Sequence, residues 1–231
     1  MPGFYFSVAG TPHISTTLQG HYTFQHEGQQ LVLLPEKAIY WQDQQTLICA
    51  DLHLGKAGHF RKAGVPIPGN VHWEDLGRLS LLLEAWQPRE LLLLGDLFHS
   101  DINNEWTFFE RWMEQYPRLR VVLVKGNHDI LPNAAYEISN LSVVTAPLER
   151  GPYSFTHHPT STSNLYNLAG HIHPSVALQG RGRQRISLPC FYFGLKGGIL
   201  PAFGRFTGTA RITPTPKEAV FGITQDRVIA L

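Results

Sequence analysis

Three short apolar runs, each ending abruptly in polar residues, constrain the fold of this chain most strongly. They are residues 46–51 (TLICAD), 90–96 (ELLLLGD) and 119–127 (LRVVLVKGN). Between them lie two segments with apolar residues at helical spacing, 70–86 and 104–116, and a proline follows each segment. Strand–helix–strand–helix–strand is the order typical of an α/β core. We therefore predict that the three runs are neighbouring parallel strands.

After residue 140 the pattern changes. Short β-like runs follow one another, separated by Gly, Pro and Ser, and few helical windows remain. This predicts a second sheet, largely antiparallel or mixed. Residues 31–41 (LVLLPEKAIYW) are also β-like, and we expect them to pair with that second sheet. A length of 231 residues fits one domain over residues 1–231, with residues 1–27 as an extension of unassigned role.

Histidine is the unusual component of the composition. Twelve histidines outnumber eleven glutamates, and nine of them lie between His53 and His173. Imidazoles gathered in the middle of a chain indicate metal or acid–base chemistry. Cys49 and Cys190 lie in apolar runs, which favours buried thiols in a reducing compartment over a disulfide framework. No run approaches the ~20 apolar residues of a membrane span, and residues 1–10 lack the basic region and apolar stretch expected of a secretory signal. We expect a cytoplasmic protein with no membrane association.

Charge is divided unequally along the chain. Residues 1–173 contain eleven Lys or Arg against sixteen Asp or Glu, whereas residues 174–231 contain eight against two. The net charge of +1 therefore conceals an acidic part and a basic one, and the basic part favours a polyanionic partner. Arg181, Arg183 and Arg185 alternate, so a strand there would place three guanidinium groups on one face. Both a nucleic-acid contact and an ordinary solvated face remain open for them.

Polar residues with metal-binding chemistry follow each of the three apolar runs. They are Asp51 and His53 after the first, Asp96 after the second, and Asn127, His128 and Asp129 after the third. The carboxyl ends of parallel strands share one edge of a sheet, where ligands bind. Asp51 and His53 are two residues apart, so in extended chain both side chains would point the same way. His171 and His173 repeat this spacing, and His157 ends a further β-like run.

The side chains gathered in this way include carboxylates, an amide oxygen and imidazoles, but no thiolate. This mixture disfavours a structural zinc site and suits manganese, iron or zinc in a catalytic role. Seven candidate ligands exceed the needs of one ion and fit two ions that share a bridging ligand. Such two-metal sites are typical of phosphatases and nucleases. The seven candidates are Asp51, His53, Asp96, Asn127, His157, His171 and His173.

The order D-x-H, G-D-x-x-H, G-N-H-D, a single His and G-H-x-H over residues 51–173 resembles the calcineurin-like metallophosphoesterase superfamily. The resemblance implies a four-layer α/β/β/α sandwich with two mixed sheets and the metals at the sheet edge. It implies one ion held by Asp51, His53, Asp96 and His173, and a second held by Asp96, Asn127, His157 and His171. It also implies that His128 acts on the phosphate or the leaving oxygen, oriented by Asp129.

A closer resemblance is to the bacterial DNA ligase-associated metallophosphoesterases. Its motifs are residues 35–41 (PEKAIYW), 51–56 (DLHLGK), 60–61 (FR), 64–66 (GVP), 95–100 (GDLFHS), 188–191 (LPCF) and 200–208 (LPAFGRFTG). This resemblance implies a manganese-dependent phosphodiesterase, with zinc or iron as alternatives. It implies that the protein is an endonuclease acting on single-stranded or flexible DNA in repair. It further implies functional association with a DNA ligase, a helicase and an exonuclease.

Several alternatives accompany these expectations. His158 rivals His157 as a ligand, and we favour His157 because it directly ends its run. Arg61 and His99 are candidates for substrate binding, weighed against a surface charge and simple loop packing respectively. The same chemistry could act on a small substrate such as a cyclic nucleotide, a nucleotide-sugar diester or a phosphomonoester. A non-catalytic scaffold is the third alternative, but it would not need His128 and Asp129.

Overall fold

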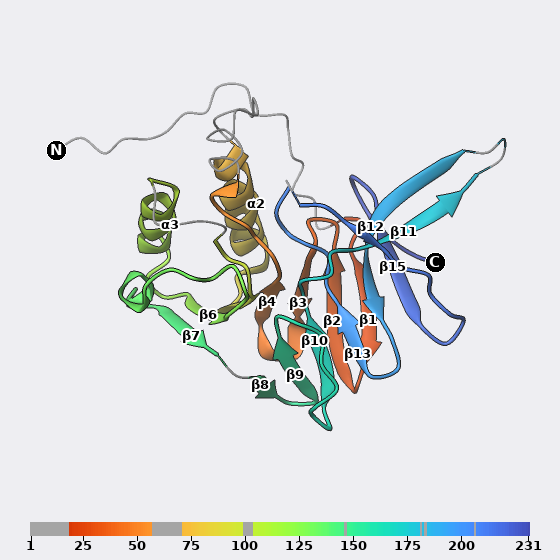
Figure 1. Ribbon diagram of the computed structural model, residues 1–231, viewed down its shortest axis with the longest axis horizontal. Coiled ribbons are helices and arrows are strands. Elements are labelled where there is room, and N and C mark those ends of the chain that lie inside the picture. Colours follow the sequence, from red (N-terminus) through yellow and green to blue (C-terminus); the bar gives the residue numbers. More distant parts are fainter. Residues whose placement is uncertain are drawn as a thin grey trace.

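Two mixed β-sheets packed face to face, with helices on the outer side of one of them, form the body of the molecule (Figure 1). The computed structural model describes residues 19–56, 71–98, 104–145, 147–180, 182, 184–205 and 207–231. Arg61, His99, Arg181 and Arg183 therefore lie outside the described residues. Among the helices of the described part, none is both long and apolar enough to cross a bilayer.

The first sheet has the strand order β1-β2-β3-β4-β5-β6-β7. Its strands are β1 (Tyr22–His26), β2 (Gln29–Leu34), β3 (Ala38–Trp41), β4 (Thr46–Cys49), β5 (Glu90–Leu94), β6 (Arg120–Val124) and β7 (Leu141–Val144). β4, β5, β6 and β7 pair in parallel, so the prediction for the three apolar runs is confirmed. Each of these runs reads as continuously apolar because a parallel sheet is buried on both faces.

The expectation that residues 31–41 pair with the second sheet is wrong. β2 and β3 form antiparallel ladders within the first sheet, and β3 pairs with β4. The connections explain this placement: two residues separate β1 from β2, and the short helix η1 (Gln42–Gln44) joins β3 to the start of β4. Connections this short keep consecutive antiparallel strands adjacent.

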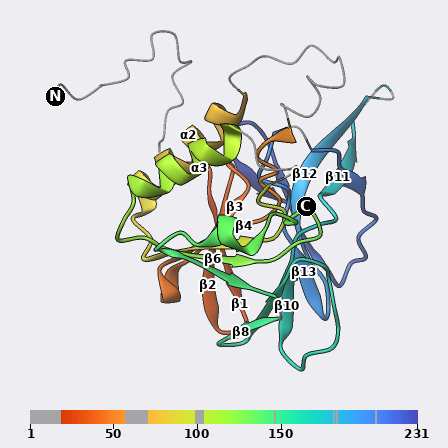
Figure 2. The same ribbon diagram turned by 60° about the vertical axis from the view of Figure 1, so that its left-hand side comes forward.

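The two α-helices of the described residues cover one face of the first sheet, as both views show (Figure 1, Figure 2). They are α2 (Val71–Trp86) and α3 (Asn104–Glu114), within two residues of the predicted bounds. The buried side chains Leu79 and Phe109 lie with those of Leu47 and Leu91 in a core between helices and sheet. The indole nitrogen of Trp112 donates a 2.8 Å hydrogen bond to Ser80 Oγ and ties α3 to α2.

The second sheet has the order β14-β11-β12-β13-β10-β9-β8, with β15 paired to β12 and β16 to β15. Its strands are β8 (Leu148–Arg150), β9 (Tyr153–Thr156), β10 (Tyr166–Ala169), β11 (Pro174–Gln179), β12 (Arg185–Phe193), β13 (Gly197–Ile199), β14 (Ala210–Arg211), β15 (Ala219–Ile223) and β16 (Val228–Ala230). β9, β10 and β13 are parallel neighbours and β12 is antiparallel to β11, β13 and β15, so the sheet is mixed, as predicted.

A core shared by both sheets lies between them. Ile48 and Leu92 of the first sheet pack there with the aromatic side chains of Phe155, Phe191 and Phe221. This shared core supports the single-domain organisation, which stays a prediction. The described residues after Leu141 contain no α-helix. The two sheets and one helical layer of the expected sandwich are therefore described, and a small apolar cluster lies on the outer face of the second sheet.

A segment following β13 returns to the first sheet and is held there by α2. The amide of Phe203 donates to Ala50 O at 2.8 Å, and the amide of Gly204 donates to Asp51 O at 3.1 Å. Arg78 of α2 donates to the Phe203 carbonyl, bonds Asp75 Oδ1 at 3.1 Å and lies over the Phe203 ring. The carboxy-terminal part of the chain thereby abuts the end of β4.

We expect Arg78→Leu to lower the free energy of unfolding by about 3 kcal/mol, because it removes the guanidinium partner of the buried Asp75 carboxylate. The side chains of Arg78 and Asp75 are only 13% and 8% exposed. Urea unfolding measures the change. Arg227→Leu is the matched control: its pair with Asp226 is 63% and 67% exposed, so it should cost less than about 1 kcal/mol. Equal losses in the two variants would contradict the interpretation.

Candidate metal centre

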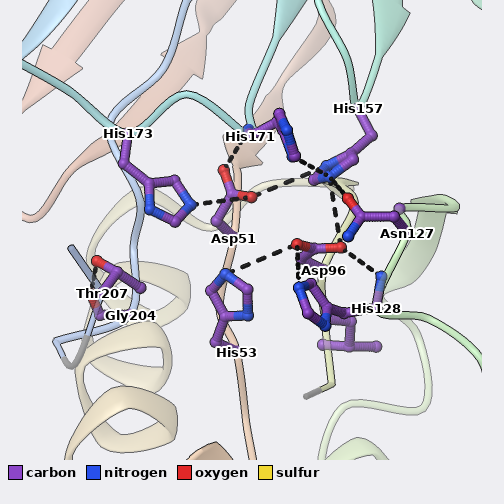
Figure 3. Close-up of polar contacts among 12 residues, drawn as sticks. Asp51, His53, Asp96, Asn127, His128, His157, His171, His173, Gly204 and Thr207 are labelled. Carbon is purple, nitrogen blue, oxygen red and sulfur yellow. Dashed lines mark hydrogen bonds and ion pairs between the residues drawn. The ribbon is translucent and has the colours of Figure 1, made fainter. Parts of the chain in front are cut away.

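The polar residues predicted to bind metal converge where the two sheets meet. Segments following β4, β5 and β6 supply residues from the first sheet, and segments following β9 and β10 supply them from the second. Their side chains point toward one another (Figure 3). The residues brought together are Asp51, His53, Asp96, Asn127, His128, His157, His171 and His173.

One group of potential ligands comprises Asp51, His53 and His173, whose ligand atoms all lie within 4.8 Å of one another. His173 Nε2 is 3.3 Å from Asp51 Oδ1. Both atoms are buried and neither has a hydrogen-bond partner among the described residues. Buried polar atoms without a partner are costly. A cation between them would satisfy both, so these residues fit a metal ion.

A second group surrounds Nε2 of His157. This atom lies 3.0 Å from Asn127 Oδ1, 3.1 Å from His171 Nδ1 and 3.4 Å from Asp96 Oδ1. Ligand atoms ~2.1 Å from a tetrahedral ion lie ~3.4 Å from one another, and closer when more ligands surround the ion. The spacing of these nitrogen and oxygen atoms therefore also fits a metal ion.

Asp96 lies between the two groups. Its Oδ2 is 3.7 Å from Nε2 of His53, in the first group, and its Oδ1 is 3.4 Å from Nε2 of His157, in the second. The amide of His128 also donates to Oδ1, at 2.9 Å, and holds the carboxylate in this orientation. One carboxylate thus presents an oxygen to each group, which is the arrangement of a bridging ligand.

Backbone carbonyls orient two of the imidazoles. His157 Nδ1 lies 3.0 Å from Leu94 O, and His173 Nδ1 lies 3.1 Å from Gly208 O. A proton on each Nδ1 would be donated to the carbonyl, leaving Nε2 as the atom that can bind a cation. Sequence reasoning missed the contribution of Gly208, although its motif was noticed, because a main-chain carbonyl has no residue-type signal.

The backbone at this edge is bent rather than extended. Five of the seven expected ligands have a left-handed conformation: Asp51 (φ 53°), His53 (φ 48°), Asp96 (φ 49°), His171 (φ 67°) and His173 (φ 51°). The extended-chain reason for the two-residue spacing is therefore wrong, although the side chains do converge. This conformation costs about 1–2 kcal/mol per residue, and such strain is concentrated at functional sites.

Two glycines leave space for the carboxylates of Asp51 and Asp96 beside neighbouring segments of the backbone. A Cβ at Gly170 would lie 2.5 Å from Asp51 Oδ2, and a Cβ at Gly126 would lie 2.4 Å from Asp96 Oδ1. Neither distance is compatible with van der Waals contact. The glycines of the G-H-x-H and G-N-H-D motifs are thus explained by the space that the carboxylates occupy.

The histidine pair at the end of β9 divides by burial. His157 is 3% exposed and its Nε2 lies at the centre of the second group, whereas His158 is exposed, with its ring centre 4.0 Å from that of His171. This geometry favours His157 as the ligand. Burial, followed by the charges of His158 and His157, lowers the pKa of His171. This shift favours the neutral ring, the state in which imidazole binds a cation.

Asp129 lies in a buried environment where main-chain amides surround its carboxylate. It is fully buried, and its Oδ1 accepts hydrogen bonds from the amides of Leu97 and Phe98, while its Oδ2 accepts one from Gly126. These three bonds tie the loop after β6 to the loop after β5, and the expected role of Asp129 in orienting the His128 ring stays a prediction. Burial raises its pKa, and the three N–H donors oppose that shift.

Comparisons with known proteins agree with this geometry. The sequence profile of the calcineurin-like phosphoesterase family matches residues 45–208. No curated protein sequence matches the chain. Among solved structures, the nuclease MPE of Pseudomonas putida is 34% identical, with a TM-score of 0.77, over 91% of this chain and 100% of that chain. The phosphoesterase Yfce of E. coli is 15% identical, with a TM-score of 0.41, over 80% of this chain and 96% of that one.

The profile covers most of the chain, and it includes every residue that converges at the edge where the two sheets meet. The solved structure that is 34% identical extends the similarity across nearly the whole length. The chain belongs to the calcineurin-like phosphoesterase family of metal-dependent hydrolases.

Proposed function

We propose that this protein is a two-metal phosphodiesterase that hydrolyses DNA phosphodiester bonds as an endonuclease in repair. The observation that carries the metal chemistry is the carboxylate of Asp96, which presents one oxygen to each ligand group. The choice of DNA is supported by the 34% identity to a nuclease over 91% of the chain and by the basic segment 174–231. A small phosphodiester or phosphomonoester is the alternative substrate.

The proposed ligand sets are the two groups described above. Asp51, His53, Asp96 and His173 would hold one divalent ion, and Asp96, Asn127, His157 and His171 the other. Manganese suits this mixture of oxygen and imidazole donors, with zinc and iron as alternatives. When bound, the two ions would supply Lewis acidity toward the phosphate and lower the pKa of water.

The residues of the chain would contribute binding and proton transfer around these ions. His128 is proposed to act on the substrate, because its side chain is 41% exposed while its Nε2 lies only 4.0 Å from Asp96 Oδ2. A ring in this position can donate a proton to a phosphate or leaving oxygen, the usual work of a general acid. Asp129 would keep the loop of His128 in place through its three amide contacts.

The proposed cellular setting follows from the resemblance of the sequence. We propose that single-stranded or flexible DNA is the substrate, and that the enzyme works with a DNA ligase, a helicase and an exonuclease. We also propose a cytoplasmic location, which is supported by the two buried free thiols, Cys49 and Cys190.

Asp96→Asn should reduce bound manganese from two ions per chain to one or none, because the bridging carboxylate loses a charge. Metal analysis after dialysis measures this number. The rise in melting temperature on adding manganese should shrink with it, since a ligand stabilises the folded state only when it binds. The control is Glu84→Gln, an exposed carboxylate on α2. Two tightly bound ions in the Asp96 variant would contradict the bridging role.

His128→Ala should keep two manganese ions and lose activity by roughly 10²- to 10⁴-fold, the usual contribution of general acid–base catalysis. Turnover of a phosphodiester and metal content are measured on the same sample. His21→Ala, at an exposed position just before β1, should change neither quantity. A His128 variant that loses its metal would assign this residue to the ligands instead.

Circular single-stranded DNA and duplex plasmid, each incubated with purified protein in manganese, zinc or magnesium, test the function itself. Cleavage of a closed circle is expected and identifies an endonuclease, because an exonuclease has no end to attack. For a polymer substrate, kcat/KM should fall steeply with added salt. Hydrolysis of small diesters only, with weak salt dependence, would favour the alternative substrate. Metal binding without any hydrolysis would revive the scaffold hypothesis.

A further inference from the structure

The long hairpin of β11 and β12 projects from the sandwich and has its base at the metal centre. Figure 1 shows the two strands extending beyond the rest of the second sheet. β11 begins at Pro174, directly after His173, and its ladder with β12 runs from Ser175↔Pro189 to Gln179↔Arg185. The short edge strand β14 joins it there, since the amide of Ala210 donates to His173 O at 2.9 Å.

On one face of this hairpin, the type of side chain changes with distance from the sandwich. Phe191 of β12 packs in the core between the sheets, and side chains two residues apart share a face of a strand. The register extends this face across three strands. Its members outside the core are Pro189, Ser187 and Arg185 on β12, Ser175, Ala177 and Gln179 on β11, and Arg211 on β14. Large aromatic side chains therefore give way to small and basic ones.

The opposite face of the hairpin is apolar, which confirms the assignment of the two faces. Val176 and Leu188 are buried in the outer cluster, and Leu178 and Ile212 pack against them. These residues alternate with the small and basic ones along each strand, as the register requires. The arginines are thus on the face that continues toward the core between the sheets, and the metal centre lies where that core ends.

The positive charges of the two arginines on this face are not balanced by ion pairs with described residues. Arg185 and Arg211 are exposed, and within the described part of the chain neither forms an ion pair. Arg205 and Arg227, by contrast, are paired with Glu74 and Asp226. β11, β12 and β14 contain no Asp or Glu.

Arg211 and Arg185 also lie at increasing distances from the metal centre. Arg211 is level with Ser175, two residues after His173, and Arg185 is level with Gln179, four residues further along β11. At ~3.3 Å per residue, the two positions are ~13 Å apart along the hairpin. The positive charge is therefore arranged as a line that starts beside His173, rather than as a single spot that would hold one phosphate group.

We propose that this face, defined by Arg185, Arg211 and the small side chains of Ala177 and Ser187 between them, binds the phosphate backbone of the DNA strand that enters the metal centre. The planar forks of the arginines suit phosphate oxygens, and the small side chains leave the backbone room to approach. A mononucleotide substrate is too short to reach both arginines. The inference rests on the proposed function, because it assigns that same site a polymeric substrate.

The test removes both charges and measures cleavage of single-stranded DNA by the manganese-loaded protein across a series of KCl concentrations. For Arg185→Gln/Arg211→Gln, the slope of log kcat/KM against log salt should become shallower by about 1.4, and activity at 0.1 M KCl should fall about 25-fold, since each phosphate contact on a single strand contributes about 0.7 to the slope. Hydrolysis of the small diester bis(p-nitrophenyl) phosphate should not change.

The matched control is Arg111→Gln/Arg118→Gln, which removes the same charge from two exposed positions, one on α3 and the other two residues before β6. It should keep the slope and rate of the unaltered protein. A hairpin variant that behaves like this control would overturn the inference and leave the proposed function intact. Equal loss on DNA and on the small diester would also overturn it, by placing the effect at the metal centre. Failure of the unaltered protein to cleave DNA at all would instead refute the proposed function.

Discussion

Two buried carboxylates at the ends of neighbouring strands are the constraint on which the rest of the structure depends. Asp51 and Asp96 are 0% and 2% exposed, and a buried ionised carboxylate requires hydrogen bonds or positive charge to offset its desolvation. Main-chain amides satisfy one oxygen of each: His171 donates to Asp51 and His128 donates to Asp96. The remaining oxygens face imidazoles. The left-handed backbone conformations and the glycines Gly126 and Gly170 allow the backbone to hold these buried charges.

The scaffold around the site is built to resist that strain. β4, β5 and β6 are buried on both faces, so their ends are held firmly by the helical layer on one side and the aromatic core on the other. The segment after β13 adds a further support, because Gly204 bonds to the chain at Asp51 and Gly208 orients the ring of His173. Arg78 connects this segment to α2. Arg78 is not itself a proposed ligand, but it thereby helps to hold the proposed ligands in position.

The acidic and basic parts of the sequence contribute different parts of the fold. The acidic part of the chain contributes the two strand-end carboxylates, and the basic part contributes the hairpin that starts beside them, directly after His173. A polyanion approaching a site with buried carboxylates meets repulsion unless cations and arginines compensate for it. Metal ions at the metal centre and guanidinium groups along the hairpin would supply this positive charge at the two ends of the path that the DNA strand takes.

The sequence by itself determined the three central strands and both helices, because a run buried on both faces and an amphipathic helix each leave a periodic pattern. It also predicted the chemistry of the site, since the type of each proposed ligand is a property of a single residue. Only the tertiary structure decided that β2 and β3 belong to the first sheet, that Asp129 bonds main-chain amides, and that the Gly208 carbonyl orients His173. The physical reason is common to all three. A local pattern specifies a conformation and a polarity, whereas a partner distant in sequence is chosen by how the whole chain packs.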